Sequence, residues 1–470
     1  MEGRQSWRVA PVCKTGPERV SEFESHPLHQ QGVKMNNLFI LSEEVPQSFA
    51  TILNIIESQN KTRNVLLNKI ADKERLVYEI FGHQTNYDKV YYVLTSKRGK
   101  GSFVDYMCFE GESFPNEQSI PFLFIEETKN SGKDAGNMLT QRLTKWNAID
   151  ANPKYINARK VFLIKDRSSI LDTEKSFKRP VSVADFRCYA TYGVDVYISD
   201  YSSDLVKKLT FQPYTSILDM EEQENKRIRS SNSITQNNSQ IYIEALLKKG
   251  GGTSDPNIGY VSSRSWIINK LEPNNKIIIG KKHQMPQKWF EGKNKLTETL
   301  RHIGVDIEFE DGSLLSIPTQ KNVFDEYAWK YERKNEKIAS ISLEMFLISE
   351  GWQIIFTNHG GTSKSYVKTE NEYFATKKGN GLPDLVAYKD GKLIVIEAEQ
   401  YKNYTSGLRQ TKTFGDFVQK EILDRMLDAE NVTVKYFLAL SNFSEPKPHV
   451  LWGLTKDMEI WYNSSCEEIK

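Results

Sequence analysis

Apolar and polar residues follow one another along this chain in a pattern that predicts the same order of elements twice. In residues 48–82 the apolar positions recur at helical spacing and stop at Gly82, which predicts a helix. The segments KVYYVLTS, GSFVDYMCF and IPFLFIEETK then predict three strands, with KRGKG as the turn of a hairpin between the first two. AGNMLTQRLTKWNAI predicts a second helix, and ARKVFLIKD predicts a buried strand.

The C-terminal third gives this order again, although no sequence identity links the two copies. EKIASISLEMFLISEG predicts a helix closed by Gly351, and WQIIFT predicts a strand. After a long polar insertion, LPDLVAYKDGKLIVIEAEQ predicts two strands joined by a tight Asp-Gly turn. LRQTKTFGDFVQKEILDRMLDAE predicts one long helix, and VTVKYFLALSN predicts a strand. The fold class expected is therefore mixed α/β, with two αβββαβ cores in one chain.

The segments outside these two copies are less regular. Between them, ENKRIRSSNSITQNNSQ predicts a linker and KKGGGTSDP a loop, whereas SSRSWIINKL and LTETLRHIG predict helices, KIIIGKK a strand and DIEFEDGSLLSI a hairpin. The first 34 residues show no periodicity and predict disorder, and Met35 is a candidate start of the native chain. The expected divisions are 1–34, 35–200, 201–330 and 331–470.

Composition narrows the class of protein. A chain of 470 residues with 39% hydrophobic residues and a mean hydropathy of -0.55 suits a soluble protein of two or three domains. No apolar run approaches the roughly 18 residues of a membrane span, and no secretory signal is visible. Four cysteines lie far apart without a CxxC pair, which argues against disulfides and structural zinc. We therefore expect a cytoplasmic protein.

Charge is uneven although the formal net charge is only +2. Residues 241–301 hold 11 Lys and Arg residues against 5 Asp and Glu residues. A solvated surface and a nucleic-acid footprint both explain such a bias, and the sequence leaves the two open. On the second interpretation, phosphate contacts are expected from the basic residues of this module: Lys281, Lys282, Lys288, Lys293 and Arg301.

In the N-terminal copy, an apolar strand runs directly into charged residues. Side chains alternate between the faces of a strand, so Glu127 and Lys129 share one face and Glu126 takes the other. Asp105 belongs to the preceding strand, and hairpin neighbours lie about 5 Å apart. We therefore expect Asp105, Glu127 and Lys129 to converge. The alternative is a strand that simply surfaces into solvent.

In the C-terminal copy, Pro383-Asp384 opens one strand and Glu397-Ala398-Glu399 ends the next. By alternation Glu397 and Glu399 share a face, and the hairpin brings Asp384 alongside. Converging carboxylates repel one another, and a divalent cation relieves that repulsion. Glu344 of the preceding helix is a candidate fourth oxygen ligand, with an exposed helix position as the alternative. Carboxylates with a lysine suit Mg²⁺-assisted phosphodiester hydrolysis.

These two layouts resemble the motifs of the PD-(D/E)xK nuclease superfamily. In the C-terminal copy, 12 residues separate Leu382-Pro383-Asp384 from Glu397-Ala398-Glu399, and Glu399 stands where lysine is usual. In the N-terminal copy, 21 residues separate Asp105 from Glu127-Thr128-Lys129, which keeps the lysine but has Val104 in place of proline. The resemblance covers residues 50–200 and 335–465.

The resemblance implies restriction-endonuclease-like αβββαβ cores that use Mg²⁺. It implies metal ligation by Asp105, Glu127, Asp384 and Glu397, and catalytic roles for these four together with Lys129 and Glu399. The implied activity is site-specific hydrolysis of double-stranded DNA, as in a type II restriction endonuclease of a restriction-modification system. Two interpretations of the two cores stay open: each core cuts one strand, or one core holds DNA without cutting it. Such an enzyme works as a monomer or homodimer, alongside a cognate DNA methyltransferase.

Two other classes of function stay open at this stage. A repair or recombination nuclease that reads DNA structure would carry the same motifs. A non-catalytic DNA-binding protein on degenerate nuclease cores would bind without metal and with strong salt dependence. A structural or adaptor protein gives no reason for two acidic strand ends.

Overall fold

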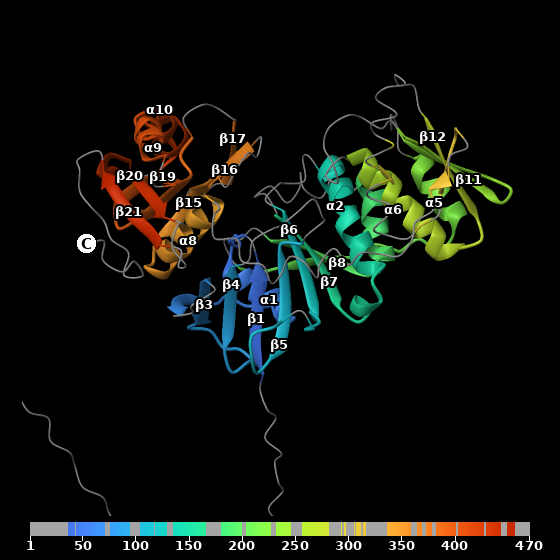
Figure 1. Ribbon diagram of the computed structural model, residues 1–470, viewed down its shortest axis with the longest axis horizontal. Helices are drawn as coiled ribbons and strands as arrows, with labels where there is room; N and C mark the ends of the chain where they lie inside the picture. Colours follow the sequence, from blue (N-terminus) through green and yellow to red (C-terminus); the bar gives the residue numbers. More distant parts are fainter. Residues whose placement is uncertain are drawn as a thin grey trace, which may run out of the picture. The chain divides into compact units, whose positions relative to one another are not determined.

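The computed structural model describes residues 36–455, without a number of segments between the elements. The omitted segments of four or more residues are 71–75, 95–103, 129–134, 166–179, 200–203, 227–231, 246–255, 282–292, 298–304, 316–335, 359–363, 369–372, 378–381 and 443–448, and single residues or pairs are omitted elsewhere. The described residues form helices and three mixed β-sheets, so the mixed α/β class is confirmed (Figure 1). Among them, no helix combines the length and apolar character needed to cross a membrane.

Sheet A contains nine strands in the order β2-β3-β4-β1-β5-β6-β7-β8-β9. Their bounds are β1 Asn37–Ser42, β2 Leu66–Ile70, β3 Leu76–Phe81, β4 Val90–Leu94, β5 Tyr106–Gly111, β6 Leu123–Thr128, β7 Arg159–Lys165, β8 Val194–Ser199 and β9 Lys207–Leu209. Strand β1 pairs in parallel with β4 and antiparallel with β5. The predicted hairpin between β4 and β5 is therefore wrong, because the apolar and buried β1 lies between them.

The predicted helix over residues 48–82 is also wrong beyond its first turns. Helix α1 spans Phe49–Ile56, and Ser58 then adopts a positive φ of 53°, which a helix does not accommodate. The rest of the segment forms β2 and β3, which pair antiparallel with each other. β-Branched and aromatic residues such as Val77, Tyr78 and Ile80 favour this strand structure over a helix.

Helices cover both faces of sheet A. Helix α1 packs with the face that carries Leu123 and Ile125, whereas α2 (Ala135–Asp150) packs with the face that carries Phe124 and Phe162. Helix α2 connects β6 to the parallel strand β7, with the short 3-10 helix η2 (Pro153–Tyr155) after it, and α4 (Pro180–Thr191) connects β7 to the parallel strand β8. The prediction of α2 and β7 is confirmed.

Sheet B has the order β10-β11-β12-β13-β14. The bounds are α5 Ile217–Asn225, β10 Ser233–Asn237, β11 Gln240–Ala245, α6 Pro256–Leu271, β12 Lys276–Lys281, β13 Ile307–Phe309 and β14 Leu314–Leu315. Residues 233–240 of the predicted linker form β10, a turn with Asn238 at φ 53° and the start of β11, so the linker prediction is wrong for this part. Helix α6, strand β12 and the β13–β14 hairpin are confirmed. Most of LTETLRHIG and all of residues 1–34 lie outside the described residues.

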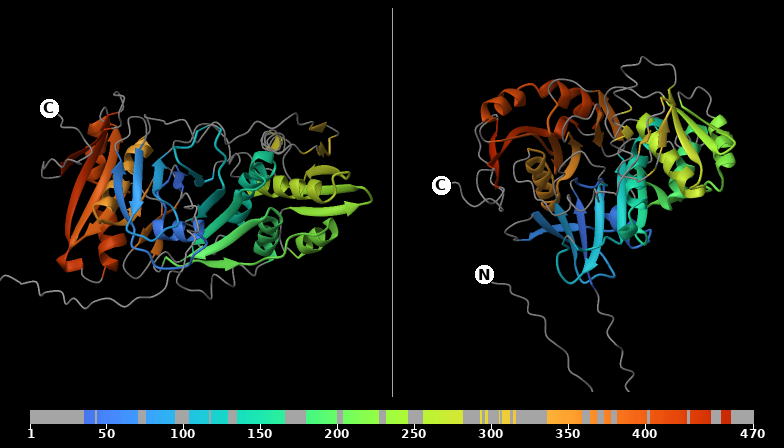
Figure 2. Two further views of the ribbon diagram at one scale, coloured as in Figure 1. Left: turned by 90° about the horizontal axis from the view of Figure 1, so that it is seen from below. Right: turned by 45° about the vertical axis from the view of Figure 1, so that its right-hand side comes forward.

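Sheet B has the same topology as one half of sheet A. The pairings β5–β6, β6–β7, β7–β8 and β8–β9 are antiparallel, parallel, parallel and antiparallel, and the pairings from β10 to β14 follow the same series. Gly193-Val194-Asp195 leads into β8, and Gly304-Val305-Asp306 precedes β13 in the sequence. The crossover helices α2 and α6 lie side by side in both figures (Figures 1 and 2). Sheet B and this half of sheet A therefore share one order of parallel and antiparallel pairings.

Sheet C has the order β17-β16-β15-β18-β19-β20-β21. The bounds are α8 Glu336–Ser349, β15 Gln353–Thr357, β16 Lys364–Lys368, β17 Tyr373–Lys377, β18 Leu385–Lys389, β19 Lys392–Gln400, α9 Tyr404–Thr411, α10 Gly415–Phe417, the π-helix η5 Val418–Ile422, the 3-10 helices η6 Leu423–Arg425 and η7 Ala429–Asn431, β20 Thr433–Asn442 and β21 His449–Thr455. Helix α8, strands β15, β18, β19 and β20, and the turn at Asp390 and Gly391 are confirmed.

Two details of the predicted C-terminal copy are wrong. The polar insertion contains the hairpin of β16 and β17. The long helix is interrupted between α9 and α10, where the hydroxyls of Thr411 and Thr413 donate to the carbonyls of Leu408 and Gln410. Threonine side chains that bond the backbone in this way compete with regular helix.

Candidate functional site

Asp105 and Glu126 form a carboxylate pair at one end of the β5–β6 hairpin, which we call the sheet A site. The register pairs Tyr106 with Ile125, and one residue further along it sets Asp105 opposite Glu126. Residues directly opposite in an antiparallel pair project to the same face. The backbone amide of Glu127 donates to Asp105 Oδ2 at 2.7 Å, which fixes the aspartate at the strand entrance.

Glu127 projects to the other face, so its predicted grouping with Asp105 is wrong. Its carboxylate accepts a hydrogen bond from the Tyr106 hydroxyl at 2.5 Å and one from the Gln47 backbone amide at 3.4 Å. A register that differs by one residue exchanges the two faces of a strand. The sequence pattern showed the alternation of β6 but not the register between β5 and β6.

Helix α2 brings two cations to Glu126. Lys145 Nζ lies 2.6 and 2.7 Å from the two carboxylate oxygens, and Arg142 Nε lies 3.0 Å from Oε1. The Glu126 side chain is 1% exposed, whereas those of Lys145 and Arg142 are 20% and 22% exposed. The Glu126 carboxylate is therefore buried, and the two cations that pair with it are partly exposed to solvent.

The surroundings of Asp105 disfavour the charged form of its carboxyl. Burial raises the pKa of Asp105 well above its ordinary value, and the neighbouring charge of Glu126 raises it further. The ammonium of Lys145 acts in the opposite direction.

The position that usually holds the motif lysine is occupied here by another residue. Thr128 lies two residues after Glu126 on the same face of β6 and is 1% exposed. Lys129 follows Glu127 in the alternation and lies outside the described residues. The strand itself therefore presents no cation on the Asp105 face between Glu126 and its described end at Thr128.

Asp384, Glu397 and Glu399 form the corresponding group in sheet C, which we call the sheet C site. The register pairs Leu385 with Ile396, and the Asp384 amide donates to the Ile396 carbonyl at 3.0 Å, so Asp384 lies opposite Glu397. The backbone amide of Ala398 donates to Asp384 Oδ2 at 2.9 Å. The expected grouping of these carboxylates on one face is therefore what the structure has.

Helix α9 covers the sheet C site. A Cβ built on Gly407 of α9 would stand 3.1 Å from Cγ of Glu399 and 2.4 Å from a methyl of Leu438. Glu397 and Glu399 are 5% and 7% exposed. The absence of a side chain at residue 407 thus allows α9 to pack directly over the acidic strand end.

The two sites share one geometry. In each site an aspartate at the start of one strand lies opposite a glutamate on the next strand. The aspartate accepts a hydrogen bond from the backbone amide one residue after that glutamate. Both carboxylates lie on the sheet face that the next crossover helix covers. No three His, Cys, Asp or Glu side chains among the described residues are close enough together to form a complete metal cage. A carboxylate pair nevertheless fits Mg²⁺, which proteins bind through one or two carboxylates with water and substrate phosphate.

The described residues of sheet B include no equivalent carboxylate pair, despite the similar topology. The residues of β11 that face α6 are Ile241, Ile243 and Ala245, which are fully buried and apolar. Glu244 belongs to the other face and accepts a hydrogen bond from the Ser233 hydroxyl. Sheet B therefore repeats the topology without the acidic chemistry.

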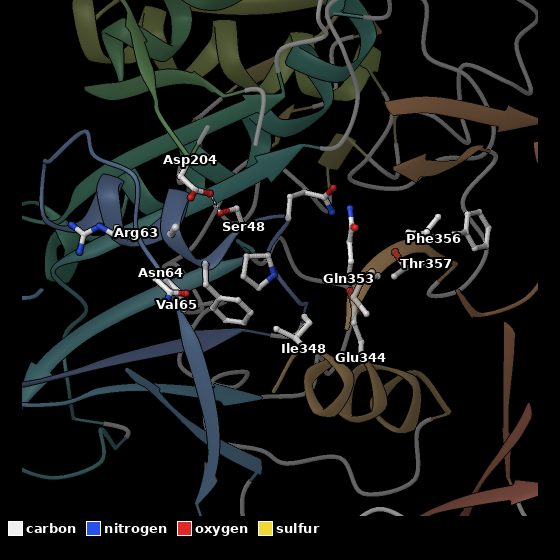
Figure 3. A pocket seen from close by; sticks show the side chains of 16 residues that line it. Ser48, Arg63, Asn64, Val65, Asp204, Glu344, Ile348, Gln353, Phe356 and Thr357 are labelled. Atoms are coloured by element: carbon white, nitrogen blue, oxygen red, sulfur yellow. Dashed lines mark hydrogen bonds between the residues drawn. The ribbon is translucent and has the colours of Figure 1, made fainter. Parts of the chain in front are cut away.

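Glu344 does not lie with Asp384, Glu397 and Glu399, where the sequence suggested a fourth oxygen ligand. It projects from α8 into a cavity of about 370 Å³ lined also by Ser48, Arg63, Gln353 and Thr357 (Figure 3). Residues Ile341 and Met345 on the same side of α8 pack with the core that includes α1, whereas Leu343 and Leu347 pack with sheet C. Helix α8 thus turns Glu344 away from the sheet C face that it covers.

Two of the described basic residues of the middle module, Lys276 and Lys293, form ion pairs with acidic residues of the same module. Lys293 pairs with Asp311 at 2.5 Å and stacks over the ring of Phe309, and Lys276 pairs with Glu308 at 2.5 Å. Lys281 ends β12. Lys282, Lys288 and Arg301 lie outside the described residues, so their predicted phosphate contacts stay predictions.

Three residues of the sheet A site were missed from the sequence: Glu126, Arg142 and Lys145. The available signals were the second glutamate of the strand end and two basic residues three positions apart in a predicted helix, which lie on one helix face.

Comparisons with protein-family models, curated proteins and solved structures found no match for this chain. The basis for a function is therefore the geometry of the two acidic hairpins.

Proposed function

We propose that the chain is a metal-dependent nuclease that hydrolyses phosphodiester bonds of double-stranded DNA. The single observation that carries the proposal is the recurrence of one geometry in two hairpins: the Asp105–Glu126 pair and the Asp384–Glu397 pair, each fixed by a backbone amide. Carboxylates gathered at the same place in two hairpins repel one another unless positive charge compensates them, and a bound divalent cation would supply that charge. The resemblance to PD-(D/E)xK nucleases supports the same activity.

Each carboxylate pair would hold one Mg²⁺. When bound, this ion polarises a phosphoryl oxygen and lowers the pKa of a coordinated water. The residues of the chain provide the oxygen ligands, hold them on one strand face and shield them from bulk water. In the overall reaction a water oxygen bonds to phosphorus and releases one proton, one P–O ester bond breaks with its electron pair on the leaving oxygen, and the leaving oxygen takes up one proton, so no net proton is consumed.

Two sites in one chain suit the cutting of two antiparallel strands. A site-specific endonuclease of this kind needs no two-fold symmetry in its target, because the two sites belong to different parts of one polypeptide. We also propose that the enzyme recognises a DNA sequence and not a DNA structure. Discrete fragments from a plasmid would support it, and a smear would favour the structure-reading nuclease.

The test is cleavage of supercoiled plasmid with Mg²⁺ by wild type, Asp105→Asn, Asp384→Asn and the double variant. Asparagine keeps the shape and removes the charge, so each single variant is expected to nick one strand and the double variant to be inert. Glu110→Gln is the matched control, since Glu110 is exposed on β5 and belongs to neither site. An inert wild type on varied DNA and metals would rule out the nuclease.

One observation favours a second candidate for sheet A alone. Glu126 is already neutralised by Lys145 and Arg142, as in a site that holds DNA without cutting it. In that case Asp105→Asn would leave double-strand cutting intact, and Asp384→Asn would abolish it. This candidate also predicts DNA binding that persists in EDTA and weakens steeply as the salt concentration rises.

A further inference from the structure

We propose that Lys145 of helix α2 is the catalytic cation of the sheet A site, in the place that a strand lysine would otherwise take. This proposal rests on the proposed nuclease function. It gives Lys145 the catalytic role that the resemblance implied for Lys129. Its basis is the contact between Lys145 Nζ and both oxygens of Glu126, at 2.6 and 2.7 Å.

The described part of β6, which ends at Thr128, carries no lysine on the Asp105 face. Glu126 and Thr128 share that face, and Glu127 takes the other with the Tyr106 hydroxyl. Among the described residues, the cations at Glu126 come from helix α2. Helix α2 covers this face, because Leu139, Leu143 and Trp146 pack in the same core as Phe124.

Lys145 also has the exposure that contact with substrate requires. Its side chain is 20% exposed, whereas Glu126 beneath it is 1% exposed and Asp105 is 7% exposed. A phosphate that approached the pair would meet the ammonium on the accessible side. There the ammonium would neutralise charge that develops on the phosphoryl oxygens and donate a hydrogen bond to the attacking water.

Arg142 has a different task in this arrangement. Its Nε lies 3.0 Å from one Glu126 oxygen, a contact that does not involve Lys145. It can therefore keep Glu126 compensated and in place when Lys145 turns to substrate. Arg142 is a positioning residue, and the fold does not depend on Lys145 alone.

The test uses the full chain with Asp384→Asn, which silences the sheet C site and leaves nicking by sheet A. In this parent, Lys145→Ala is expected to lower the single-turnover nicking rate by about 100-fold or more, the usual loss when one donor to a transition-state anion is removed. Lys145→Arg is expected to restore part of the rate. Mn²⁺ binding and the melting temperature are expected to stay those of the parent, because Arg142 still holds Glu126.

The matched control is Lys208→Ala, which removes one positive charge from the same sheet at a half-exposed side chain paired with Asp195. Its nicking rate is expected to equal that of the parent. Nicking by Lys145→Ala at the parental rate would overturn the inference. Loss of Mn²⁺ binding together with nicking would also overturn it, since Lys145 would then only hold Glu126 in place.

The outcomes separate this inference from the proposed function. A wild type that cuts no DNA removes both. A wild type that cuts, with an Asp384→Asn parent that does not nick, keeps the nuclease and removes the catalytic role of Lys145.

Discussion

Gly259 of α6 lies against the backbone of Thr140 in α2 at a distance that admits no side chain. A Cβ on residue 259 would stand 2.1 Å from the Thr140 carbonyl oxygen, so the two helices approach at their backbones. We expect Gly259→Ala to lower the free energy of unfolding by about 3 kcal/mol, the upper part of the range for overpacked positions. Urea denaturation measures this change.

The control for that substitution is Gly415→Ala. A Cβ on residue 415 meets nothing within 4 Å, so the variant is expected to be neutral or up to about 1 kcal/mol more stable, as for glycine to alanine in a helix. Equal stability of the two variants would contradict the close packing of α2 and α6.

The register of the β5–β6 hairpin predicts different outcomes for two adjacent glutamates. In the Asp384→Asn background, Glu126→Gln is expected to reduce nicking by at least about 100-fold, because it removes a metal ligand, whereas Glu127→Gln is expected to stay within about tenfold of the parent. The side-chain amide oxygen in Glu127→Gln can still accept a hydrogen bond from the Tyr106 hydroxyl. The measurement is the nicking rate of each purified variant, and the reverse order of effects would restore the pairing expected from the sequence.

Gly407 gives a test of the sheet C site alone. A Cβ there would stand 3.1 Å from Cγ of Glu399 and 2.4 Å from Leu438, so Gly407→Ala is expected to displace α9 and lower the nicking rate of an Asp105→Asn parent by about tenfold or more. The same substitution in the Asp384→Asn parent should leave nicking unchanged. An equal loss in both parents would show that the two sites are coupled.

Asp150, at the end of α2, ties three elements together and makes stability depend on pH. It accepts hydrogen bonds from Lys160 at 2.7 Å, Lys270 at 2.9 Å and the Trp266 indole at 3.0 Å. Burial alone would raise the pKa of Asp150, but these partners outweigh it and hold the pKa below the ordinary value of 3.8. A carboxyl with a lowered folded-state pKa stabilises the fold above its unfolded pKa, and this contribution is lost as the pH falls through the folded value.

We therefore expect Asp150→Asn to cost about 1–3 kcal/mol at neutral pH, the range for hydrogen bonds to charged groups. Below about pH 4 the difference from wild type should begin to shrink, because Asp150 of the unfolded chain takes up a proton there, whereas the folded carboxylate does so only at a lower pH. Chemical denaturation at pH 7 and pH 3 measures both quantities. A difference that grew on acidification would contradict the sign of the pKa shift.

The buried Arg264 predicts a large loss of stability. Its Nη2 lies 2.8 Å from Asp185 and 2.8 Å from Glu224, and all three side chains are almost fully buried. Removing one partner leaves charges buried without compensation, so Arg264→Met is expected to cost about 3–5 kcal/mol. Arg425→Met, which breaks the half-exposed pair with Glu421, should cost less than about 1 kcal/mol in the same denaturation measurement.

Local patterns in the sequence were sufficient for much of the fold. The helices α2, α6 and α8 and the apolar strands β7, β12 and β20 follow from spacing alone, because each is decided by its own residues. The position of β1 between β4 and β5 depends on partners distant in the sequence, and no local pattern encodes it. The β10–β11 hairpin was missed because polar residues such as Gln236 and Asn237 outweighed its short alternation.

The candidate site shows the same division. In sheet C the turn at Asp390 and Gly391 fixes the register, so the grouping of Asp384, Glu397 and Glu399 followed from the sequence. In sheet A a long loop separates β5 from β6, and one residue of register decides between Glu126 and Glu127. Lys145 comes from a different element, so only the packing of α2 on the sheet brings it to Glu126.

Helix α2 meets two neighbours at fixed points along its length. Thr140 rests against Gly259 of sheet B's crossover helix, and Lys145 rests on Glu126 of sheet A. A helix of 16 residues is stiff on this scale, so the contact with Gly259 and the contact with Glu126 keep a fixed spacing along α2. The place of the ammonium over the sheet A carboxylates is therefore set by packing against sheet B's crossover helix as well as by sheet A itself.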